Sequence, residues 1–394
     1  MTAHARSTPS GCAGPLRILH VFGIMGRGGA ERRTIDLMKS LDPTRVSLEF
    51  CTLGEAKGAL DSEIRELGGR VHPTPLGPGF PLRFLRLLHD RDYGAVHAHV
   101  HHTSGPLVAL AALAKVPVRV VHYRSCSDGQ SASPRRRLQR HIFRALVERH
   151  ATNILAVSES AMRSAWKQEW RTDPRCRVIY NGIDLTDYPP LSQIRERPSL
   201  RDALKLPKRT KLIVHVGRYT AAKNHLRMLS MFASHRSRNR SGHDTHLVLV
   251  GRDADGLEPV LDALIHQRGL QDFVHRLGER DDVASLLQQS DMMLFPSLWE
   301  GLPGAVLEAC AAHLPVLASA IDPIVELQVR LPSVRSLALD RPDSTWADAI
   351  TKMLNHPPPA PEIAASRHAL DDGPFSMARC RAQHLDVWGA AANL

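Results

Sequence analysis

Residues 16–41 read LRILHVFGIMGRGGAERRTIDLMKSL: a short apolar run, a glycine-rich turn and then apolar residues at helical spacing. The same order returns after VSLEFCTL (46–53), GAVHAHV (94–100) and VPVRVVHY (116–123). Runs this apolar are typical of strands buried on both faces, which occur in parallel sheets whose neighbours are joined by crossover helices. The repeat therefore predicts an α/β domain with a doubly wound, Rossmann-like parallel sheet.

A second series of such units begins at KLIVHVG (211–217) and continues through THLVLVG, DFVHRLG, DMMLFPS and LPVLAS. Between the two series, LTDYPPLSQIRERPS (185–199) is rich in proline and charge and has no apolar periodicity, as is typical of a linker. Near the end of the chain, FSMARCRAQHLDVWGA (375–390) has the spacing of one more helix. We therefore predict two Rossmann-like domains that face a cleft.

The predicted division of the chain follows from these segments. It comprises an N-terminus without fixed structure (1–15), a first domain (16–184), the linker (185–199), a second domain (200–372) and a C-terminal helix (373–394).

Composition narrows the class of protein. The 394 residues include 43% hydrophobic and 23% charged residues, which is typical of a folded globular chain. The net charge of +11 favours anionic partners, but only 5% of residues are aromatic and no basic run is interleaved with them, which argues against a nucleic-acid binder. The six cysteines form no Cys-x-x-Cys pair, and neither a signal peptide nor a membrane span is visible, so we expect a cytoplasmic protein.

The first candidate ligand loop is GIMGRGGAE (23–31). Open α/β sheets bind ligands beyond the carboxyl ends of their strands, where helix N-termini offer free amides to anions. Gly26, Gly28 and Gly29 would let a phosphate approach the backbone closely. The loop matches neither the dinucleotide fingerprint nor the Walker pattern, so a flexible turn remains the alternative.

The second candidate loop is HVGRYTAAKNH (215–225), which places Arg218 just past a strand and Lys223 near the next helix. A guanidinium and an ammonium together could neutralise a diphosphate without a metal ion. The alternative is a pair of unrelated surface cations.

The third loop, FPSLWEGLPGAVLEACA (295–311), carries Glu300 and Glu308, with Pro303 suited to the first turn of a helix. On a helix this spacing is about 12 Å, too long for a glycosidase acid–base pair, so the carboxylates would hold different parts of one long ligand. A sugar nucleotide is such a ligand, with its sugar at Glu300 and its ribose at Glu308. Its diphosphate would lie over Gly301, Leu302, Pro303 and Gly304. The alternative is a capping carboxylate and a solvated helical residue.

Histidines and a pair of aspartates form two further groups. His97, His99 and His101 alternate, beside His102, so a strand would place them on one face. Zinc is one interpretation, but no carboxylate or cysteine completes the set, which favours a hydrogen-bonded wall of the cleft. Asp253 and Asp255 in VGRDADG could bind a divalent ion, although the surrounding glycines favour a turn.

His122 ends the strand-like segment VPVRVVHY, where its side chain could contact a sugar or an acceptor, or lie in the core.

Together these segments resemble the retaining glycosyltransferases of family 4, which have the two-Rossmann-domain GT-B fold, and within them the branch that assembles bacterial polysaccharides. The resemblance covers nearly the whole chain: GGAER, HAH, HYRS, LAVSES, VIYNGID, HVGRYTAAKNH, LVLVG and LLQQSDMMLFPSLWEGLPGAVLEACAAHLPV. It implies an acceptor domain at 16–184 and a nucleotide-sugar donor domain at 200–372, with the C-terminal helix packed on the former. The sequence departs from the family pattern at His313, at GRDADG and at IDPIVE (321–326).

The resemblance also implies the roles of single residues. Arg218 and Lys223 would contact the donor diphosphate, Glu300 the transferred sugar and Glu308 the ribose. Gly28 and Gly29 would face the phosphates from across the cleft, and His122 and His99 would lie near the sugar. No metal and no cofactor are implied, because the UDP- or GDP-linked sugar is a co-substrate and fixed cations stabilise the leaving group.

The expected function is transfer of a hexose-type sugar to a glycan or lipid-linked acceptor in cell-surface polysaccharide synthesis. The alternatives are a GT-B epimerase and an inactive binding subunit of a glycosyltransferase complex. The stretch SPRRRLQRHIFR (133–144) could lie on anionic lipid at the inner face of the cell membrane, or be a solvated helix.

Overall fold

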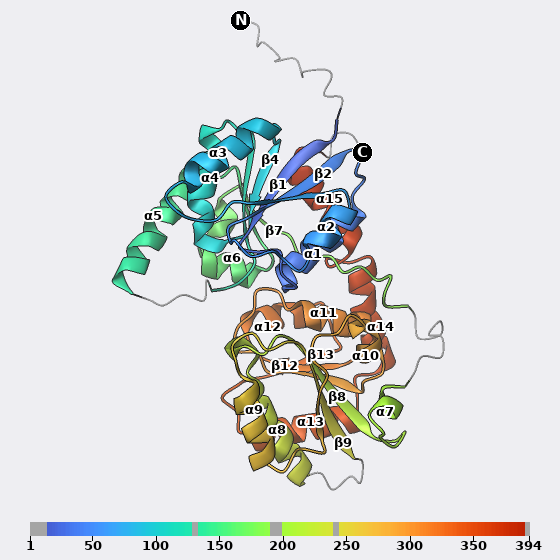
Figure 1. The fold of residues 1–394 in the computed structure, drawn as a ribbon. Helices are drawn as coiled ribbons and strands as arrows, with labels where there is room; N and C mark the ends of the chain where they lie inside the picture. The colour runs from blue at the N-terminus through green and yellow to red at the C-terminus, as the bar shows by residue number, and fades with distance from the viewer. Residues whose placement is uncertain (1–13, 128–132, 190–198, 239–243, 391–394) are drawn as a thin grey trace, which may run out of the picture.

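The computed structural model describes residues 14–127, 133–189, 199–238 and 244–390. Within them the chain forms two α/β domains, each built on a parallel sheet that helices flank (Figure 1). The greater part of the predicted linker 185–199 and of the predicted unstructured terminus 1–15 lies outside the described residues.

The N-terminal domain contains a seven-stranded sheet in the order β3-β2-β1-β4-β5-β6-β7, and its neighbouring strands pair in parallel. Residues 18–22 of the central strand β1 are all buried, because helices cover both of its faces. The strands are β1 (Leu16–Phe22), β2 (Val46–Thr52), β3 (Arg70–Pro73), β4 (Ala95–Ala98), β5 (Val118–Tyr123), β6 (Asn153–Ala156) and β7 (Cys176–Val178).

The helices of this domain are α1 (Gly29–Ser40), α2 (Asp61–Glu66), α3 (Phe80–Arg91), α4 (Ser104–Leu113), α5 (Pro134–His150) and α6 (Glu159–Ala165), with short 3-10 helices η1 (His101–Thr103) and η2 (Trp170–Thr172).

The C-terminal domain contains a six-stranded parallel sheet in the order β10-β9-β8-β11-β12-β13. Its strands are β8 (Lys211–Val216), β9 (Thr245–Val250), β10 (Val274–Arg276), β11 (Met292–Phe295), β12 (Val316–Ser319) and β13 (Val334–Leu337). Its helical segments are α7 (Leu200–Ala203), η4 (Ala221–Lys223), α8 (His225–Arg238), α9 (Glu258–Gln267), α10 (Val283–Gln288), α11 (Gly304–Ala311), α12 (Asp322–Gln328) and α13 (Asp343–Asn355).

Two helices at the end of the chain connect the domains. Helix α14 (Ala360–Asp371) packs against α11 of the C-terminal domain, and α15 (Met377–Val387) packs against α1 of the N-terminal domain. Trp388, directly after α15, is buried and donates a hydrogen bond from Nε1 to Nδ1 of His97, 3.2 Å away. The predicted fold class, two Rossmann-like domains with a C-terminal helix that crosses back, is confirmed.

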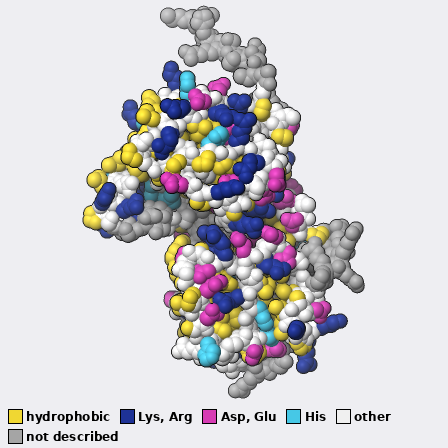
Figure 2. Space-filling view, viewed as in Figure 1, with side chains coloured by type: hydrophobic (Ala, Val, Ile, Leu, Met, Phe, Trp, Pro, Cys, Tyr) yellow, Lys and Arg dark blue, Asp and Glu magenta, His cyan; other side chains and the backbone are white. Residues whose placement is uncertain are grey.

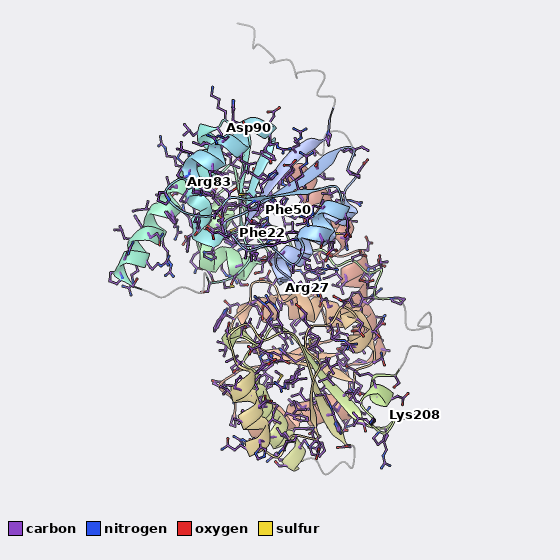
Figure 3. The ribbon with its side chains drawn as sticks, in the orientation of Figure 1. Phe22, Arg27, Phe50, Arg83, Asp90 and Lys208 are labelled. Carbon is purple, nitrogen blue, oxygen red and sulfur yellow. The ribbon has the colours of Figure 1, made fainter. Side chains whose placement is uncertain are left out.

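The two domains also share apolar packing. One cluster of buried residues includes Tyr123 and Ala156 of the N-terminal domain together with Phe295, Leu302 and Val306 of the C-terminal domain. Arg27 lies where the domains meet (Figure 3), and its guanidinium donates a hydrogen bond to Asp281 across the junction at 3.0 Å. Figure 2 shows basic and acidic side chains side by side over this junction. The two domains therefore contact each other through apolar side chains and through charged side chains.

Candidate active site

The candidate residues lie beyond strands at which the order of each sheet reverses. In the N-terminal sheet β1 lies beside β4, and in the C-terminal sheet β8 lies beside β11. Adjacent loops diverge at such a point and leave a crevice at the carboxyl edge of the sheet. Gly28 follows β1 and His99 follows β4, while Arg218 follows β8 and Glu300 follows β11. The topology thus gathers these four residues at the two sheet edges.

Lys223 and Glu300 form an ion pair in the C-terminal domain. The Nζ atom of Lys223 donates to Oε1 of Glu300 at 2.7 Å, and the two side chains are only 19% and 13% exposed. The ammonium also lies 4.6 Å from the centre of the Phe295 ring, which attracts a cation. Arg218 lies at the surface of the same domain. These contacts exclude the interpretation of Lys223 as an unrelated surface cation.

The turn that carries Lys223 is fixed by its neighbours. Asn224 has a left-handed backbone (φ 57°) between η4 and α8, and its Nδ2 donates to the carbonyl of Pro296 at 3.1 Å. Lys223, which was predicted to lie near the next helix, ends the 3-10 turn η4, and α8 begins at His225. The amide of Ala221 donates to Oδ2 of Asp255 at 3.1 Å, which ties the turn to the neighbouring loop.

Asp253 and Asp255 serve this loop instead of converging on an ion. Oxygens of Asp253 accept the amides of Leu257 and Glu258 at 2.9 and 3.0 Å, at the start of α9. These hydrogen bonds lower the pKa of Asp253, because they favour its ionised form. The structure thus supports the turn interpretation of VGRDADG.

Gly301, next to Glu300, touches the N-terminal domain. A Cβ atom at this position would lie 2.0 Å from the carbonyl oxygen of Arg124, so a larger residue could not fit without movement of the backbone. The carbonyl of Gly301 accepts a hydrogen bond from Oγ of Ser158 at 2.7 Å. Leu302 is buried and Pro303 is the residue before α11, so Pro303 precedes the first turn that was predicted to contain it. Gly304 starts the helix.

Glu308 on α11 pairs with Arg33 on α1, across the domain junction. Arg33 also lies 3.1 Å from Asp36. Burial raises the pKa of Glu308, and the guanidinium of Arg33 partly offsets this by lowering it. Glu308 is therefore a half-buried, paired carboxylate and not a solvated helical residue. Arg33 was not among the site residues predicted from the sequence, although it stands inside the GGAERR segment.

A carboxylate lies beside Gly28 at the start of α1. A Cβ atom on Gly28 would lie 2.3 Å from Oε2 of Glu31, whereas Gly29 has open space around it. The carboxylate of Glu31 accepts its own backbone amide, and the positive charges of Arg218 and Arg124 act on it. Burial nevertheless raises its pKa. The N-terminus of a helix in general favours negative charge, but for the Glu31 carboxylate the cost of burial is larger than this effect.

The IDPIVE segment forms the first part of α12 and also contacts the N-terminal domain. Oxygens of Glu326 accept hydrogen bonds from the amides of Glu159 and Ser160 at 2.9 and 3.2 Å and from the hydroxyl of Tyr180 at 2.7 Å.

The departure from the family pattern at His313 also has a structural role. His313 has φ 60° just after Ala312, the C-cap of α11, and the amide of Leu314 donates to the carbonyl of Ala309 at 2.9 Å, which closes the helix end.

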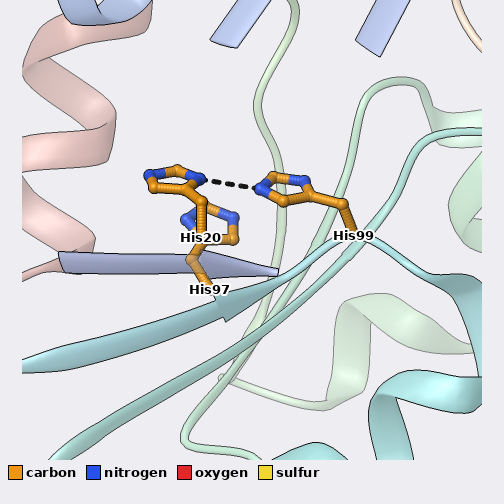
Figure 4. A group of neighbouring side chains, drawn as sticks. All are labelled: His20, His97 and His99. Carbon is orange, nitrogen blue, oxygen red and sulfur yellow. Dashed lines mark hydrogen bonds between the residues drawn. The ribbon is translucent and has the colours of Figure 1, made fainter. Parts of the chain in front are cut away.

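The histidines predicted to lie on one face of a strand are divided between the strand end and the next turn. Strand β4 ends at Ala98, so His101 and His102 lie in η1 beside Tyr123 and not on the strand. His97 and His99 instead stack with His20 of β1 (Figure 4), with ring centres 4.9 and 5.2 Å from that of His20. With two more rings they form the histidine cluster: His20, His97, His99, His122 and His384, all buried.

His122 lies inside this cluster and not on the cleft surface. Its side chain has no exposed area, and its Nδ1 lies 3.0 Å from Nε2 of His97. Because Trp388 donates to Nδ1 of His97, that nitrogen carries no proton, and His97 must donate from Nε2 to His122. The expectation that His122 contacts the sugar is therefore not met in this conformation, because protein atoms enclose the ring on all sides.

His99 and His20 form a parallel chain. Arg124 donates from Nε to Nδ1 of His99 at 3.1 Å, so His99 donates from Nε2 to Nδ1 of His20 at 2.9 Å. Burial lowers the pKa of every ring in the histidine cluster, so all of them are neutral near pH 7. His384 donates from Nδ1 to the carbonyl of Cys380 at 2.8 Å.

Two triplets of these rings, His20 with His97 and His99, and His97 with His122 and His384, have nitrogens close enough to share an ion. A neutral imidazole has one nitrogen lone pair, and in the first triplet the lone pair of every ring already accepts a hydrogen bond. In the second triplet only His384 has a lone pair that accepts none. Metal binding would require new tautomers and the loss of these bonds, so the donor set fits a hydrogen-bonded core better than a zinc site.

Arg124 is a cleft residue that sequence reasoning missed. Its guanidinium is buried and donates to His99, to Asn181 at 2.7 Å and to Thr34 at 3.2 Å. Burial lowers its pKa to about 10. The available signal was its place in HYRS, one residue beyond the carboxyl end of β5.

Comparison with known proteins agrees with this geometry. A family model described as Glycosyltransferase Family 4 matches residues 27–187, and one described as Glycosyl transferases group 1 matches residues 196–368. EpsF of Bacillus subtilis (strain 168), named as a glycosyltransferase, is 34% identical over 344 residues, which cover 85% of this chain and 87% of EpsF.

CapH of Staphylococcus aureus, named a capsular polysaccharide biosynthesis glycosyltransferase, is 28% identical over 86% of this chain and 91% of its own. The crystal structure of Anabaena Alr3699/HepE in complex with UDP-glucose superposes with a TM-score of 0.74 at 19% identity, covering 96% of this chain and 100% of that one. The sequence matches span both domains and the fold agrees, so the chain belongs to the family-4 glycosyltransferases of the GT-B fold.

Proposed function

We propose that this glycosyltransferase moves a hexose-type sugar from a UDP- or GDP-linked donor to a glycan or lipid-linked acceptor, with retention of the anomeric configuration and without a metal ion. The observation that carries the proposal is the Lys223–Glu300 ion pair beyond β8 and β11, beside the helix start at Gly304. It brings a cation, a carboxylate and free amides to one loop cluster. A diphosphate and a sugar need these three groups side by side.

In the proposed donor complex, Arg218 and Lys223 hold the diphosphate together with the loop from Gly301 to Gly304. Negative charge grows on the leaving phosphate as the bond to the sugar breaks, and fixed cations and amide dipoles stabilise that charge. With these groups in place, a metal ion is not required for charge neutralisation.

Glu300 would release part of its hold on Lys223 to accept sugar hydroxyls, while Lys223 turns to the phosphate. Glu308 would accept the ribose hydroxyls, with Arg33 keeping its carboxylate ionised. Gly28 and Gly29 complete the phosphate site from the N-terminal domain, at the start of α1, where the positive charges of Arg218 and Arg124 act.

The relatives suggest the biological context. CapH is named for capsular polysaccharide biosynthesis, and HepE has been crystallised with UDP-glucose. We therefore infer a role in bacterial polysaccharide synthesis and favour a UDP-linked donor.

Peripheral membrane contact is part of the proposal. None of the helices in the described residues is both long and apolar enough to cross a membrane. Helix α5, on the outer side of the N-terminal domain (Figure 1), exposes 63% of Leu138 and 49% of Ile142 one turn apart, with Arg135 and Arg137 exposed beside them. A basic helix with an apolar stripe is suited to an anionic lipid surface.

Thermal-shift measurements with UDP, GDP, ADP and a polynucleotide test the donor site. Binding of one nucleoside diphosphate raises the melting temperature, because a ligand that binds only the folded state stabilises it. Lys223→Ala should abolish this shift, whereas Lys208→Ala, at an exposed position far from the cleft (Figure 3), should retain it.

Turnover of a sugar nucleotide decides between the remaining alternatives. Glu300→Gln should abolish transfer while the protein still binds the nucleotide. A wild-type protein that binds nucleotide but transfers no sugar to any acceptor would indicate an inactive binding subunit, and stabilisation by polynucleotide alone would overturn the proposal.

A further inference from the structure

Helix α6 of the N-terminal domain begins beside the loop 296–303, which joins β11 to α11 in the C-terminal domain and is here called the donor loop. Ser158 is fully buried and is the N-cap of α6. Its Oγ accepts a hydrogen bond from the amide of Ala161 at 3.0 Å, as the side chain of an N-cap serine does in general. The same oxygen lies 2.7 Å from the carbonyl oxygen of Gly301 and 3.0 Å from Oγ of Ser160. One hydroxyl therefore joins a helix of one domain to the donor loop of the other.

The direction of each of these hydrogen bonds follows from the groups involved. A serine hydroxyl has one proton to donate and two lone pairs that accept. The amide of Ala161 can only donate and the carbonyl of Gly301 can only accept, so the proton of Ser158 goes to Gly301, and Ser160 donates to Ser158. Every hydrogen-bonding position of the Ser158 hydroxyl is then used. The hydroxyl is therefore held in one orientation, toward the carbonyl of Gly301.

The donor loop is fixed on both sides of Glu300. Before Glu300, the amide of Leu298 donates to the carbonyl of Ala222 at 2.8 Å, within the C-terminal domain. After Glu300, the carbonyl of Gly301 accepts the proton of Ser158 from the N-terminal domain. The backbone at Glu300 thus depends on one contact inside its own domain and on one contact to the other domain.

A second contact fixes α6 against the C-terminal domain. Helix α12 lies across the junction from α6 (Figure 1), and oxygens of Glu326 on α12 accept the amides of Glu159 and Ser160 at 2.9 and 3.2 Å. Together with the bond from Ala161 to Ser158, the first three amides of α6 have partners. Movement of α6 away from the donor loop would break all the bonds that cross the junction here.

We propose that Ser158 is a positioning residue for sugar transfer. Its hydrogen bond to Gly301 orients the backbone that carries Glu300, so this carboxylate reaches the transferred sugar only while the N-terminal domain contacts the donor loop. The inference rests on the proposed function, because it takes Glu300 as the residue that accepts the sugar hydroxyls. UDP lacks the transferred sugar, and Arg218 and Lys223, which would hold its diphosphate, come from the turn after β8. Loss of the Ser158 hydroxyl should therefore slow transfer and leave the affinity for UDP nearly unchanged.

Steady-state kinetics and calorimetry test this inference together. The kinetic assay measures release of the nucleoside diphosphate from UDP-glucose, UDP-galactose, UDP-N-acetylglucosamine and GDP-mannose, with water and a panel of nitrophenyl glycosides as acceptors. The sugar nucleotide that the wild type uses fastest then serves for the variants. Calorimetry with the free nucleoside diphosphate measures its binding separately from the chemical step.

The variant Ser158→Ala removes both the helix cap and the proton that Gly301 accepts. Its matched control is Ser376→Ala, because Ser376 is also buried and caps α15 by accepting the amide of Arg379 at 3.3 Å. Both variants should lower the melting temperature to a similar extent, since each loses one cap. Only Ser158→Ala should lower kcat, by about tenfold or more, because a small displacement of a group at the reacting sugar is costly in rate. Its Kd for the nucleoside diphosphate should stay within about twofold of the wild type.

Two further variants separate the hydrogen bond from the fold. Ser158→Thr keeps the hydroxyl and should restore kcat. Ser158→Cys keeps a side chain of similar size but offers only a weakly donating thiol, so it should lose kcat as Ser158→Ala does. It decides the question if Ser158→Ala does not fold.

Failure of the wild type to bind UDP or GDP, or to release it from any of the sugar nucleotides, would overturn the proposed function and this inference with it. With an active wild type, equal kcat values in Ser158→Ala and Ser376→Ala, or a wild-type kcat in Ser158→Cys, would overturn the positioning role alone. A loss of nucleotide affinity as large as the loss of kcat would also overturn it, because the whole donor site, and not Glu300, would then depend on the contact.

Discussion

Acidification should destabilise the N-terminal domain through the histidine cluster. His20, His97, His99 and His122 are buried, and burial holds the pKa of each well below its ordinary value near 6.5. Below about pH 6.5 the unfolded chain binds protons at these positions and the folded chain does not. The unfolded state is then favoured, so stability is complete above this pH and is lost as the pH falls.

The size of this loss of stability depends only on how many protons the unfolded chain binds, because the buried rings stay neutral in the folded protein. Between pH 7.5 and 5.5, each imidazole that stays neutral in the folded protein lowers the free energy of unfolding by about 1.4 kcal/mol. The four rings together should therefore lower the free energy of unfolding by about 5.5 kcal/mol, a large part of the stability of an ordinary domain.

Urea unfolding followed by tryptophan fluorescence at pH 7.5, 6.5 and 5.5 measures this loss. His122→Phe keeps a ring of similar shape but removes one titrating group, so its loss between pH 7.5 and 5.5 should be smaller than that of the wild type by about 1.4 kcal/mol. The exposed His89 offers a control for the substitution itself, and His89→Phe should unfold like the wild type at pH 7.5. An equal loss in wild type and His122→Phe would refute the reasoning, because it would mean that the buried ring binds a proton as readily as a solvated one.

Three substitutions at the cleft and near it have definite expected outcomes. Gly301→Ala should lower the free energy of unfolding by about 1–3 kcal/mol and abolish transfer, because the new Cβ would lie 2.0 Å from the carbonyl oxygen of Arg124. The control Gly304→Ala, which has open space around its Cβ, should melt like the wild type. Equal melting temperatures of the two variants would contradict the close approach. Arg33→Ala should destabilise the protein by about 3 kcal/mol, because Glu308 loses its partner. Adding Glu308→Gln should recover more than half of that loss. Urea unfolding that shows no loss of stability in the single variant would exclude the pairing. His313→Gly should stabilise the protein by about 1 kcal/mol in the same assay, because glycine adopts φ 60° without strain, and a lower stability would show that the imidazole makes a contact of greater value.

The sequence predicted the central strands because burial on both faces leaves an apolar run. Strand β9, THLVLV, is buried throughout and was easily found. Strands β3 and β13 were missed, since each lies at the edge of its sheet, is only four residues long and has partly exposed side chains. Helix α14 was missed because the prolines before it dominate the pattern, although Pro359 immediately precedes its first turn.

The candidate site was predictable where a residue follows its own strand. Arg218, Lys223 and Glu300 lie on loops beyond β8 and β11, so the rule for parallel sheets was sufficient to bring them together. The partners across the domain junction were not predictable. The Arg33–Glu308 pair depends on how two separately folded domains meet, which no local pattern encodes.

The histidines illustrate the same limit. Alternation along β4 correctly placed His97 and His99 near each other, but the rings that complete the cluster come from β1 and α15, far away in the sequence. Because α15 crosses from the C-terminal end of the chain to cover the first sheet, His384 and Trp388 close over His97. The alternating histidines, for which zinc binding was one interpretation, thus form part of a neutral hydrogen-bonded core.

A crystal structure of the protein with bound UDP is the most direct test of the donor site. We predict that the diphosphate oxygens lie within hydrogen-bonding distance of the side chains of Arg218 and Lys223 and of the amides at the start of α11, with the ribose at Glu308. Density for UDP in any other part of the molecule, with the Lys223–Glu300 pair unchanged, would contradict the proposed donor site.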